Sequence, residues 1–503
     1  MNRRMPAGGK ITLLNVPRHF IGSRYGMGYQ MPLGLVSIGG PLMDAGFEVD
    51  MVDADVRGLS HADIIRELKT RDTGIAMLSH PASTAGYPAV EQLGRRIKAE
   101  LPEIIQVYGG VFPTFAYREI MRRAPQIDYV VRGEGEVTAV ELADCLRKGE
   151  DLSTVKSLVW RGDNSETVIN ELRDPIHDLD VHRFGWELVD WDLYHLFGSG
   201  PFAGIQFSRG CIYRCSYCGQ WGFWRRYRHR TIKNFVDNLV ELRDTYGVRH
   251  IFPADEHFCV DRRTTEALFK EIISRDIGIP LYVNTTVKDV LRDRDLMPIY
   301  KQAGVAFAAL GIESDSPEVQ RRINKGNTLS ESTAAVGLLR RAGIIALIHM
   351  MYGLENETPK TVWRKVRSMM KIDADFVNME YITPHFWTRL GRSVEPADII
   401  QLDQGKWSYR NQVIRVPSMS PTALFWWVKL TELFIHLRPK ILFRAWLNQD
   451  QVIRHFRRRG LWRAFKVWRA EIAEFYVDTK FAKSAEPAPS GFLSLVLNKR
   501  RDL

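Results

Sequence analysis

The stretch Ser208-Arg-Gly-Cys-Ile-Tyr-Arg-Cys-Ser-Tyr-Cys-Gly-Gln220 brings three cysteines, Cys211, Cys215 and Cys218, into one short loop directly after a predicted strand. Three thiolates at this spacing can hold three irons of a [4Fe–4S] cube and leave the fourth iron open to a ligand that is not protein. Gly210 and Gly219 flank the loop, and their lack of a Cβ lets the backbone approach a cluster closely. The spacing therefore predicts an iron–sulfur centre.

A zinc site is the alternative for these thiols. Structural zinc takes four protein ligands, so the fourth would have to be Cys145, Cys259 or a distant histidine. The chain has five cysteines, an odd number with one tight cluster, which is typical of thiols that serve as ligands in a reducing cytosol and not of a disulfide framework. We expect Cys145 and Cys259 to be spectators.

Size and charge exclude few functions. A chain of 503 residues should fold as about three units. It contains no run near the ~20 apolar residues that a membrane span requires. The net charge of +11 is compatible with nucleic acid, anionic lipid or an acidic small molecule, and charge alone does not choose among them.

The N-terminal segment alternates strand-like and helix-like patterns, with a helix expected over 33–45. Such alternation predicts a doubly wound parallel sheet, which binds ligands at the carboxyl ends of its strands. We place this flavodoxin-like, Rossmann-type domain at residues 10–150, with strands at 10–16, 48–52, 74–79, 104–108 and 129–132.

A connector with a small hairpin near 157–167 is expected over 151–198. Six further strand-like runs separated by helix-length segments then predict a partly or fully closed (β/α) barrel over 199–425, with its chemistry where the strands end. A helical C-terminal region rich in Trp, Phe and Arg follows at 426–480, and residues 481–503 look like a flexible tail. The barrel strands are expected at 203–208, 250–254, 281–284, 306–311, 346–352 and 376–381.

The CxxxCxxC spacing, with the aromatic Tyr217 before the last cysteine, resembles the radical S-adenosylmethionine (SAM) superfamily over roughly residues 200–425. The resemblance implies that the open iron of the cluster chelates the amino and carboxylate groups of SAM, whose cleavage releases a 5′-deoxyadenosyl radical. It also implies SAM contacts near the strand ends. For the acids among these residues, an N-cap or a simple salt bridge is the alternative. The implied SAM-binding residues are Tyr217, Asp255 or Glu256, Asn284 and Glu313.

The first domain resembles the cobalamin-binding domain that often precedes such barrels. The matching pieces are 31–35, 79–81, 108–114 and 132–138, each at the carboxyl end of a predicted strand or the start of a helix. The Asp-x-His-x-x-Gly motif is absent, so the resemblance does not make His80 a cobalt ligand. Ordinary turn chemistry in a flavodoxin-like domain is the alternative for these loops. The implied cobalamin-binding residues are Ser79, Gly109, Gly110, Pro113, Thr114, Gly133 and Glu134.

One subgroup is similar from the cysteines onward, the anaerobic magnesium-protoporphyrin IX monomethyl ester cyclases of bacteriochlorophyll synthesis. The resemblance rests on segments 220–230, 254–256, 284–289, 353–358 and 381–387. It implies hydrogen abstraction from the C13 propionate side chain, entry of oxygen from water and closure of the fifth ring. Aromatic residues of 220–230 would stack on the porphyrin and arginines would pair with propionate, unless the aromatics pack a helix and the arginines face solvent. The residues concerned are Trp221, Trp224, Tyr227, Arg225, Arg226 and Arg228.

Two other classes of function remain open. The chain reads Gly-Ile-Glu-Ser at 311–314 where the cyclases suggest Gly-Thr-Glu, so a cobalamin-dependent C-methyltransferase acting on a tetrapyrrole or other lipophilic substrate is the alternative enzyme. The non-enzyme alternative is a basic protein that binds membrane or nucleic acid, because the basic, aromatic segment 436–469 could bind anionic lipid from the cytoplasm as a helical cap over the barrel. It lacks a nucleic-acid fold signature, so we expect no nucleic-acid partner. The expected partners are a porphyrin substrate and an electron donor such as ferredoxin or flavodoxin. No catalytic side chain is assigned.

Overall fold

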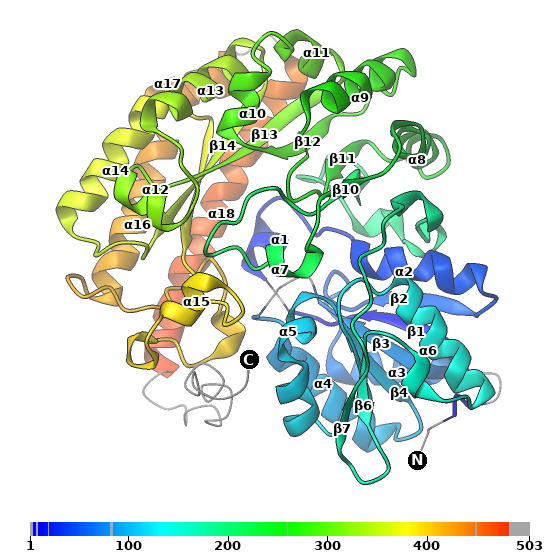
Figure 1. Cartoon of the computed structure of the whole chain (residues 1–503). Coiled ribbons are helices and arrows are strands. Elements are labelled where there is room, and N and C mark those ends of the chain that lie inside the picture. Colours follow the sequence, from blue (N-terminus) through cyan, green and yellow to red (C-terminus); the bar gives the residue numbers. More distant parts are fainter. Residues whose placement is uncertain are drawn as a thin grey trace. The chain divides into compact units, whose positions relative to one another are not determined.

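The computed structural model describes residues 4–6, 9–18, 20–80, 84–258, 260–447 and 450–481. It divides the chain into two compact units. The first unit takes its described residues from Met1–His19, Met31–Leu193 and Gly222–Arg228. The second unit takes them from Phe20–Gln30, Tyr194–Trp221 and His229–Leu503 (Figure 1). Cys259 and almost all of the expected tail lie outside the described residues.

The first unit is built on a sheet of seven strands in the order β2-β1-β3-β4-β5-β6-β7. Strands β1 to β5 pair in parallel and β6 and β7 add an antiparallel hairpin at one edge. This confirms the doubly wound sheet, and the pairing of β6 with β5 attaches the expected connector to this unit. The strands are β1 (Lys10–Asn15), β2 (Val49–Asp53), β3 (Thr73–Ser79), β4 (Ile105–Gly109), β5 (Tyr129–Val131), β6 (Leu158–Arg161) and β7 (Thr167–Ile169).

Helices cover the first sheet because its central strands are apolar on both faces. Leu13 and Leu14 are adjacent in β1 and so point to opposite faces, and neither has exposed surface, as expected for parallel strands buried between helices. Helix α3 begins at a capping box in which Ser60 and Asp63 satisfy each other's backbone amides. The helices are α2 (Leu33–Asp44), α3 (His61–Thr70), α4 (Tyr87–Glu100), α5 (Val111–Arg123) and α6 (Glu136–Lys148).

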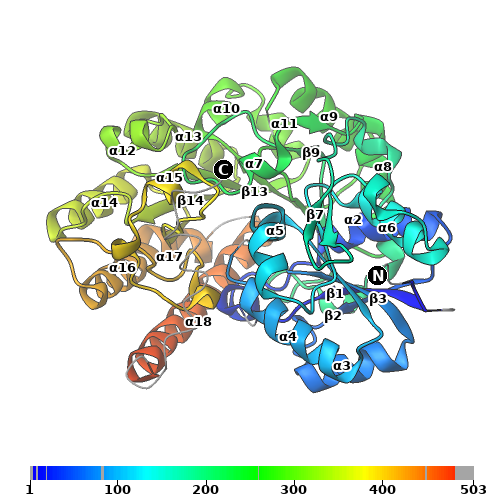
Figure 2. The same ribbon diagram turned by 60° about the horizontal axis from the view of Figure 1, so that its bottom comes forward.

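The second unit contains six parallel strands in the order β15-β14-β13-β12-β11-β8. The order is open, with β8 and β15 at the two edges, so the expected barrel is a partial one. Figure 2 shows helices following one another around this sheet. The strands are β8 (Phe202–Ile205), β11 (His250–Pro253), β12 (Leu281–Thr285), β13 (Val305–Glu313), β14 (Ile345–Tyr352) and β15 (Phe376–Tyr381). The helices are α8 (Ile232–Asp244), α9 (Arg262–Ser274), α10 (Val287–Arg292), α11 (Met297–Gln302), α12 (Pro317–Arg322), α13 (Leu329–Arg341) and α14 (Pro359–Ile372).

Three C-terminal helices complete the second unit, as the helical pattern predicts: α16 (Pro421–His436), α17 (Pro439–Leu447) and α18 (Gln451–Phe481). Helix α18 packs Ile453 and Phe456 into the apolar cluster that contains Tyr282 and Phe307 of the sheet. It also contacts the end of the short helix α1 (Ile21–Tyr25), because the Arg463 guanidinium donates to the Gly26 carbonyl at 2.8 Å. The predicted cap is therefore packed directly against the strands.

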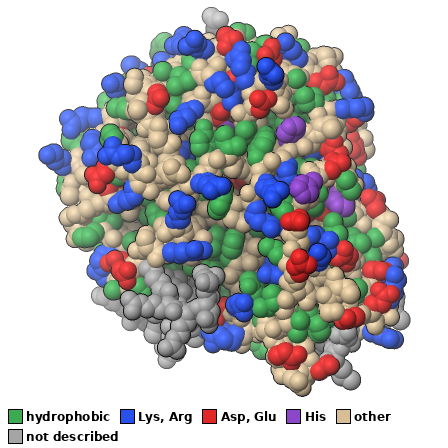
Figure 3. All heavy atoms as spheres, viewed as in Figure 1, with side chains coloured by type: hydrophobic (Ala, Val, Ile, Leu, Met, Phe, Trp, Pro, Cys, Tyr) green, Lys and Arg blue, Asp and Glu red, His purple; other side chains and the backbone are tan. Residues whose placement is uncertain are grey.

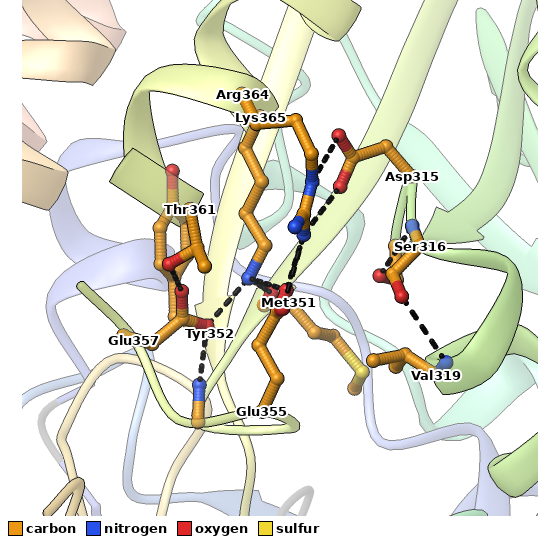
Figure 4. A network of polar contacts seen from close by, with 12 residues as sticks. Asp315, Ser316, Val319, Met351, Tyr352, Glu355, Glu357, Thr361, Arg364 and Lys365 are labelled. Atoms are coloured by element: carbon orange, nitrogen blue, oxygen red, sulfur yellow. Dashed lines mark hydrogen bonds and ion pairs between the residues drawn. The ribbon is translucent and has the colours of Figure 1, made fainter. Parts of the chain in front are cut away.

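A buried polar network holds the loops after β13 and β14 (Figure 4). The Lys365 ammonium of α14 lies 2.5 Å from the Glu357 carboxylate, and both side chains are fully buried. Beside it, the Arg364 guanidinium joins Asp315, after β13, to Glu355, after β14, at 3.0 and 2.8 Å. The network therefore orders the two loops at the carboxyl ends of these strands.

We predict that Lys365→Met lowers the free energy of unfolding by about 3–5 kcal/mol, because it leaves the Glu357 carboxylate buried without its cation. Urea unfolding followed by circular dichroism measures the change. Lys360→Met is the matched control, since Lys360 is exposed on the same helix and should change stability by no more than about 0.5 kcal/mol. Equal effects of the two substitutions would contradict the role given to the network.

Candidate functional site

The three sequence-predicted thiols lie in a loop between β9 (Ser208–Arg209) and the short helix α7 (Trp221–Trp224). Gly210 opens the loop with φ +90°, a conformation that glycine adopts at little cost. The loop is held from two sides, because the Ser216 amide donates to the Ile323 carbonyl at 3.0 Å and the Ser216 carbonyl accepts from the Leu390 amide at 2.9 Å. The loop's backbone is therefore anchored by segments far away in the sequence.

The chemistry of the thiols suits an iron–sulfur cluster. All three are half-buried, and burial raises the pKa of Cys211 and Cys215 and takes that of Cys218 to about 12. Cysteine binds metal as the thiolate, so cluster assembly at these thiols would release protons. Soft sulfur donors in a partly dry loop are what such a cluster requires.

Asp255, the second residue after β11, anchors the backbone that leads into the loop. Its carboxylate accepts from the Phe207 amide at 3.2 Å, from the Ser208 hydroxyl at 2.5 Å and from the Ser208 amide. Burial raises the pKa of Asp255 to about 7, although these donors oppose the shift. The geometry thus gives Asp255 a positioning role, whereas the sequence offered it as a SAM contact.

Glu256 and Asn284 are the neighbouring sequence-predicted residues. Both are half-buried, and the Glu256 charge contributes to the raised pKa of Cys218, which places it near the thiols. The Asn284 side-chain amide donates to the Asp255 backbone carbonyl at 3.3 Å. The Asn284 backbone carbonyl accepts from the Phe258 backbone amide at 3.2 Å. The ends of β11 and β12 are thereby tied together beside the cysteine loop.

His257 is a residue of this site that sequence reasoning missed. Its Nδ1 lies 3.8 Å from the Cys211 sulfur, its Nε2 lies 2.5 Å from the Asp289 carboxylate, and its ring stacks on Tyr213. A histidine fixed by a carboxylate and aimed at a cysteine can tune that sulfur through its second shell. The available signal was its position, two residues after Asp255 at the end of a barrel strand.

Glu313 lies in a buried polar group at the end of β13. It accepts from the Tyr217 hydroxyl at 2.8 Å and pairs with the Lys325 ammonium at 3.3 Å. Glu313 has φ +66°, beside a register irregularity after Gly311. Such strain in a non-glycine residue costs about 1–3 kcal/mol and is characteristic of functional sites. Lys325, also missed from the sequence, has its pKa raised by Glu313 and the thiols of Cys215 and Cys211 despite the opposing effect of burial.

In the first unit, the loops after β4 and β5 meet at the edge where the sequence places cobalamin. The Thr114 hydroxyl donates to the Gly110 carbonyl at 2.7 Å and accepts from the Gly133 amide at 2.8 Å. Gly133 has φ +76°, and apart from its two chain neighbours no described residue comes within 4 Å of where its Cβ would stand. The Gly110 Cβ position is 3.9 Å from the Ser79 hydroxyl at the end of β3. These loops therefore present backbone groups with little side-chain bulk, which suits a large cofactor.

Other first-unit predictions have contacts inside the protein. The Glu134 carboxylate pairs with Arg228 at 2.7 Å, with both side chains buried, and accepts from the Ile176 amide at 2.8 Å. The Pro113 side chain is buried in α5. His80 lies after β3, with Nε2 2.7 Å from the Tyr108 hydroxyl.

The structure changes the interpretation of the aromatic and basic segment 220–230. Arg228 is buried against Glu134, and Arg225 donates to the Arg173 carbonyl at 2.6 Å, so both guanidiniums are engaged within the first unit. This differs from the expected pairing of these arginines with a substrate carboxylate. Trp221 is 38% exposed, with the Arg214 guanidinium 4.9 Å from its ring centre. The sequence pattern could not tell these environments apart.

Comparison with known families agrees with this arrangement. Residues 205–369 match the radical SAM superfamily, and residues 27–143 match the B12-binding domain. The fold and the cysteine loop thus define a cobalamin-binding radical SAM protein, whose cofactors are a [4Fe–4S] cluster, SAM and cobalamin. The chain is 38% identical to the anaerobic magnesium-protoporphyrin IX monomethyl ester cyclase of Synechocystis sp., over 88% of this chain and 89% of that protein. It belongs to the family of these cyclases.

More distant relatives and one solved structure also match most of this chain. The cyclase of Rubrivivax gelatinosus is 30% identical over 76% of this chain and 70% of its own length. The hopanoid C-3 methylase of Methylococcus capsulatus is 26% identical over 70% of this chain and 67% of its own length. The radical SAM methyltransferase TsrM of Kitasatospora setae, solved with cobalamin and a [4Fe-4S] cluster, superposes with a TM-score of 0.67 at 17% identity, over 93% of this chain and 100% of that one. This likeness concerns the fold.

We predict a pH-dependent effect of Asp255→Asn on the free energy of unfolding. The folded pKa of about 7 lies above the ordinary value of 3.8, so the stabilisation due to the protonated carboxyl is complete below pH 3.8 and is lost as pH rises through 7. The wild type should therefore lose stability relative to Asp255→Asn across that window, as measured by urea unfolding at a series of pH values.

The control is Asp261→Asn, at the exposed N-cap of α9, where the Thr264 amide lowers the carboxyl pKa. The stabilisation due to the ionised Asp261 carboxylate is complete above pH 3.8 and is lost as pH falls. The wild type should therefore lose stability relative to Asp261→Asn as the pH is lowered, not as it is raised. A flat difference for Asp255→Asn between pH 4 and pH 7 would show that Asp255 is not a buried, titrating anchor.

Proposed function

We propose that this chain is an anaerobic cyclase that closes the fifth ring of magnesium-protoporphyrin IX monomethyl ester. The observation that carries the proposal is the 38% identity to a cyclase of that name across nearly the full length of both proteins. Oxygen would enter from water, and the substrate would be a porphyrin, a flat aromatic ligand that carries a carboxyl group.

In this proposal the ligands of the cluster are Cys211, Cys215 and Cys218. When bound, the cluster and SAM supply the deoxyadenosyl radical that removes a hydrogen atom from the substrate. The chain's own part is to hold these groups in register. Asp255 fixes the loop, His257 supports Cys211, and the residues proposed to meet SAM are Tyr217, Glu256, Asn284 and Glu313.

Cobalamin would lie against the carboxyl ends of β3, β4 and β5. The proposed contacts are backbone amides and small side chains of Ser79, Gly109, Gly110, Thr114 and Gly133. Gly110 and Gly133 both have positive φ, and a backbone that turns without a Cβ can approach a large cofactor closely. Pro113 and Glu134 would support these loops without contacting cobalamin themselves, since the side chains of both are buried in the protein.

A methyltransferase is the second candidate function. The likeness to the hopanoid C-3 methylase favours it, because that relative is 26% identical over 70% of this chain. Either enzyme would need an electron donor of low potential, such as ferredoxin or flavodoxin, to reduce the cluster.

We also propose that the chain binds the surface of an anionic membrane without crossing it. No helix among the described residues is long and apolar enough to cross a membrane. The basic segment 436–469 is partly structural, since Arg444 pairs with Asp373 and Arg457 pairs with Asp375. The exposed apolar side chains that suit lipid lie on α14, α16 and α17 and at Leu437 between the last two, and we call this surface the apolar face.

The apolar face exposes large hydrophobic side chains among cations. Phe443 and Trp446 of α17 are 65% and 55% exposed. No exposed Asp or Glu occurs on the described residues of the three helices, and each basic residue beside an anionic lipid surface contributes about 1 kcal/mol. Figure 3 shows Lys and Arg side chains among hydrophobic ones on the side where Figure 1 draws α14. The face comprises Trp363, Met370, Leu430, Phe434, Leu437, Phe443, Trp446 and Leu447, with Lys360, Arg367, Lys371 and Lys440.

The function is tested by reconstituting the enzyme anaerobically with iron, sulfide and hydroxocobalamin and supplying dithionite, SAM and magnesium-protoporphyrin IX monomethyl ester. Mass spectrometry should find a product with a fifth ring, together with 5′-deoxyadenosine. Replacing any one of Cys211, Cys215 and Cys218 by Ala should abolish both products and the iron–sulfur absorption, whereas Cys145→Ala should keep all three. A product heavier by one methyl group, with S-adenosylhomocysteine, would establish the methyltransferase instead.

Lipid contact is tested by sedimentation with vesicles of phosphatidylcholine, with or without phosphatidylglycerol. The wild type should sediment only with the anionic vesicles, and less so at high salt. Phe443→Glu and Trp446→Glu should reduce the bound fraction several-fold, because they place charge in the apolar face, while Val181→Glu, at an exposed apolar residue of the first unit, should not. Equal recovery of wild type in both supernatants would end the proposal, and a dimer lost in the α17 variants would assign the face to a second copy.

A further inference from the structure

The face of the second sheet opposite helices α9 to α14 carries two rows of side chains. Residues paired across parallel strands point to the same side of a sheet. One row is apolar and runs from Ala309 through Leu347 to Phe376. The next row toward the carboxyl ends runs from Gly311 through His349 to Asn378, and is polar.

Helix α18 packs the side chains of Ile453 and Phe456 against the apolar row. Phe456 and Ile453 pack in one cluster with Ala309, and Leu347 and Phe376 lie against that cluster. Gly460 of α18 is so close to the Phe376 ring that an added Cβ would lie 2.7 Å from it. We call Ile453 and Phe456 the plug. The polar row that contains His349 is the next layer from the plug toward the carboxyl ends of the strands.

His349 is held rigidly from the side. Its Nδ1 lies 2.8 Å from the Glu380 carboxylate, which also accepts from the side-chain amide of Asn378 at 2.7 Å. Behind them, the Arg410 guanidinium donates to the Asn378 carbonyl oxygen at 3.0 Å. The Glu380 carboxylate raises the pKa of His349 despite burial, which favours a ring with both nitrogens protonated.

The other ring nitrogen is available to a ligand. The His349 side chain is 27% exposed, and within the described part of the chain its hydrogen bond to Glu380 uses Nδ1, which leaves Nε2 for a ligand. Its row neighbour Gly311 lies under the Glu313 and Lys325 pair, since a Cβ there would stand 2.6 Å from the Lys325 nitrogen. His349 is thus one strand, about 4.8 Å, from the floor of the candidate SAM site.

We propose that His349 binds the free carboxylate of the substrate by donating a hydrogen bond from Nε2. This inference rests on the proposed function, because the monomethyl ester retains one free propionate. That group calls for a cation, and of the three arginines that the sequence offered, Arg225, Arg226 and Arg228, the first and last are engaged within the first unit. An imidazolium next to an apolar plug suits a flat, largely apolar ligand with one acid. His349 is a binding residue here and carries no step of the reaction.

The test is to titrate the reconstituted holoenzyme, without reductant, with the porphyrin monomethyl ester and with its dimethyl ester, following porphyrin fluorescence. His349→Gln should weaken binding of the monoester about tenfold or more and leave the diester unchanged, because a charge-assisted hydrogen bond exists only with the free acid. Glu380→Gln should act in the same direction and less strongly. His250→Gln, which removes an imidazole at the amino end of the same sheet, should affect neither ligand.

The outcomes separate the inference from the proposed function. If wild type fails to bind the monoester, the proposed substrate is wrong. If wild type binds it and His349→Gln binds it equally well, or loses both esters alike, the assignment of His349 is overturned. SAM affinity, followed by the electron paramagnetic resonance of the reduced cluster in a separate titration, should be the same in wild type and His349→Gln, and a loss there would assign His349 to the cofactor.

Discussion

The candidate site depends on one buried carboxylate, that of Asp255 at the end of β11. It accepts the backbone amides of Phe207 and Ser208 and so fixes the turn from which the cysteine loop begins. A backbone amide hidden from water must find an acceptor, and a carboxylate provides a strong one. Asp255 therefore links the parallel pairing of β8 with β11 to the location of three thiols that no regular secondary structure holds.

Around this anchor, the ends of neighbouring strands supply complementary groups. The thiols, Glu256 and Glu313 are neutral or negative, while Lys325 and the His349 ring bring positive charge into the same buried region. Each charge has a partner, which is the condition for keeping ions in a low-dielectric interior. Bound SAM, which carries charges of both signs, would enter a region already arranged to oppose them.

The C-terminal helices serve two purposes in the second unit. Helix α18 fills the amino half of the sheet's inner face with Ile453 and Phe456, so that a ligand could occupy only the half near the cysteines. The same helices leave the apolar face outward. A protein proposed to act on a lipophilic porphyrin thereby combines a partial barrel packed by α18 with a surface suited to lipid on α14, α16 and α17.

The sequence alone determined the elements and the thiols. Strand-like runs and the Cys211, Cys215 and Cys218 spacing are local signals, because periodicity and loop spacing depend on neighbours in the chain. The partners of individual charged residues were decided by the tertiary structure. Arg228 looks the same in sequence whether it meets a substrate or Glu134, and His257 and His349 gain their settings from Asp289 and Glu380 on other elements. Such pairings join residues tens of positions apart, and only the packing of parallel strands brings them within hydrogen-bonding distance.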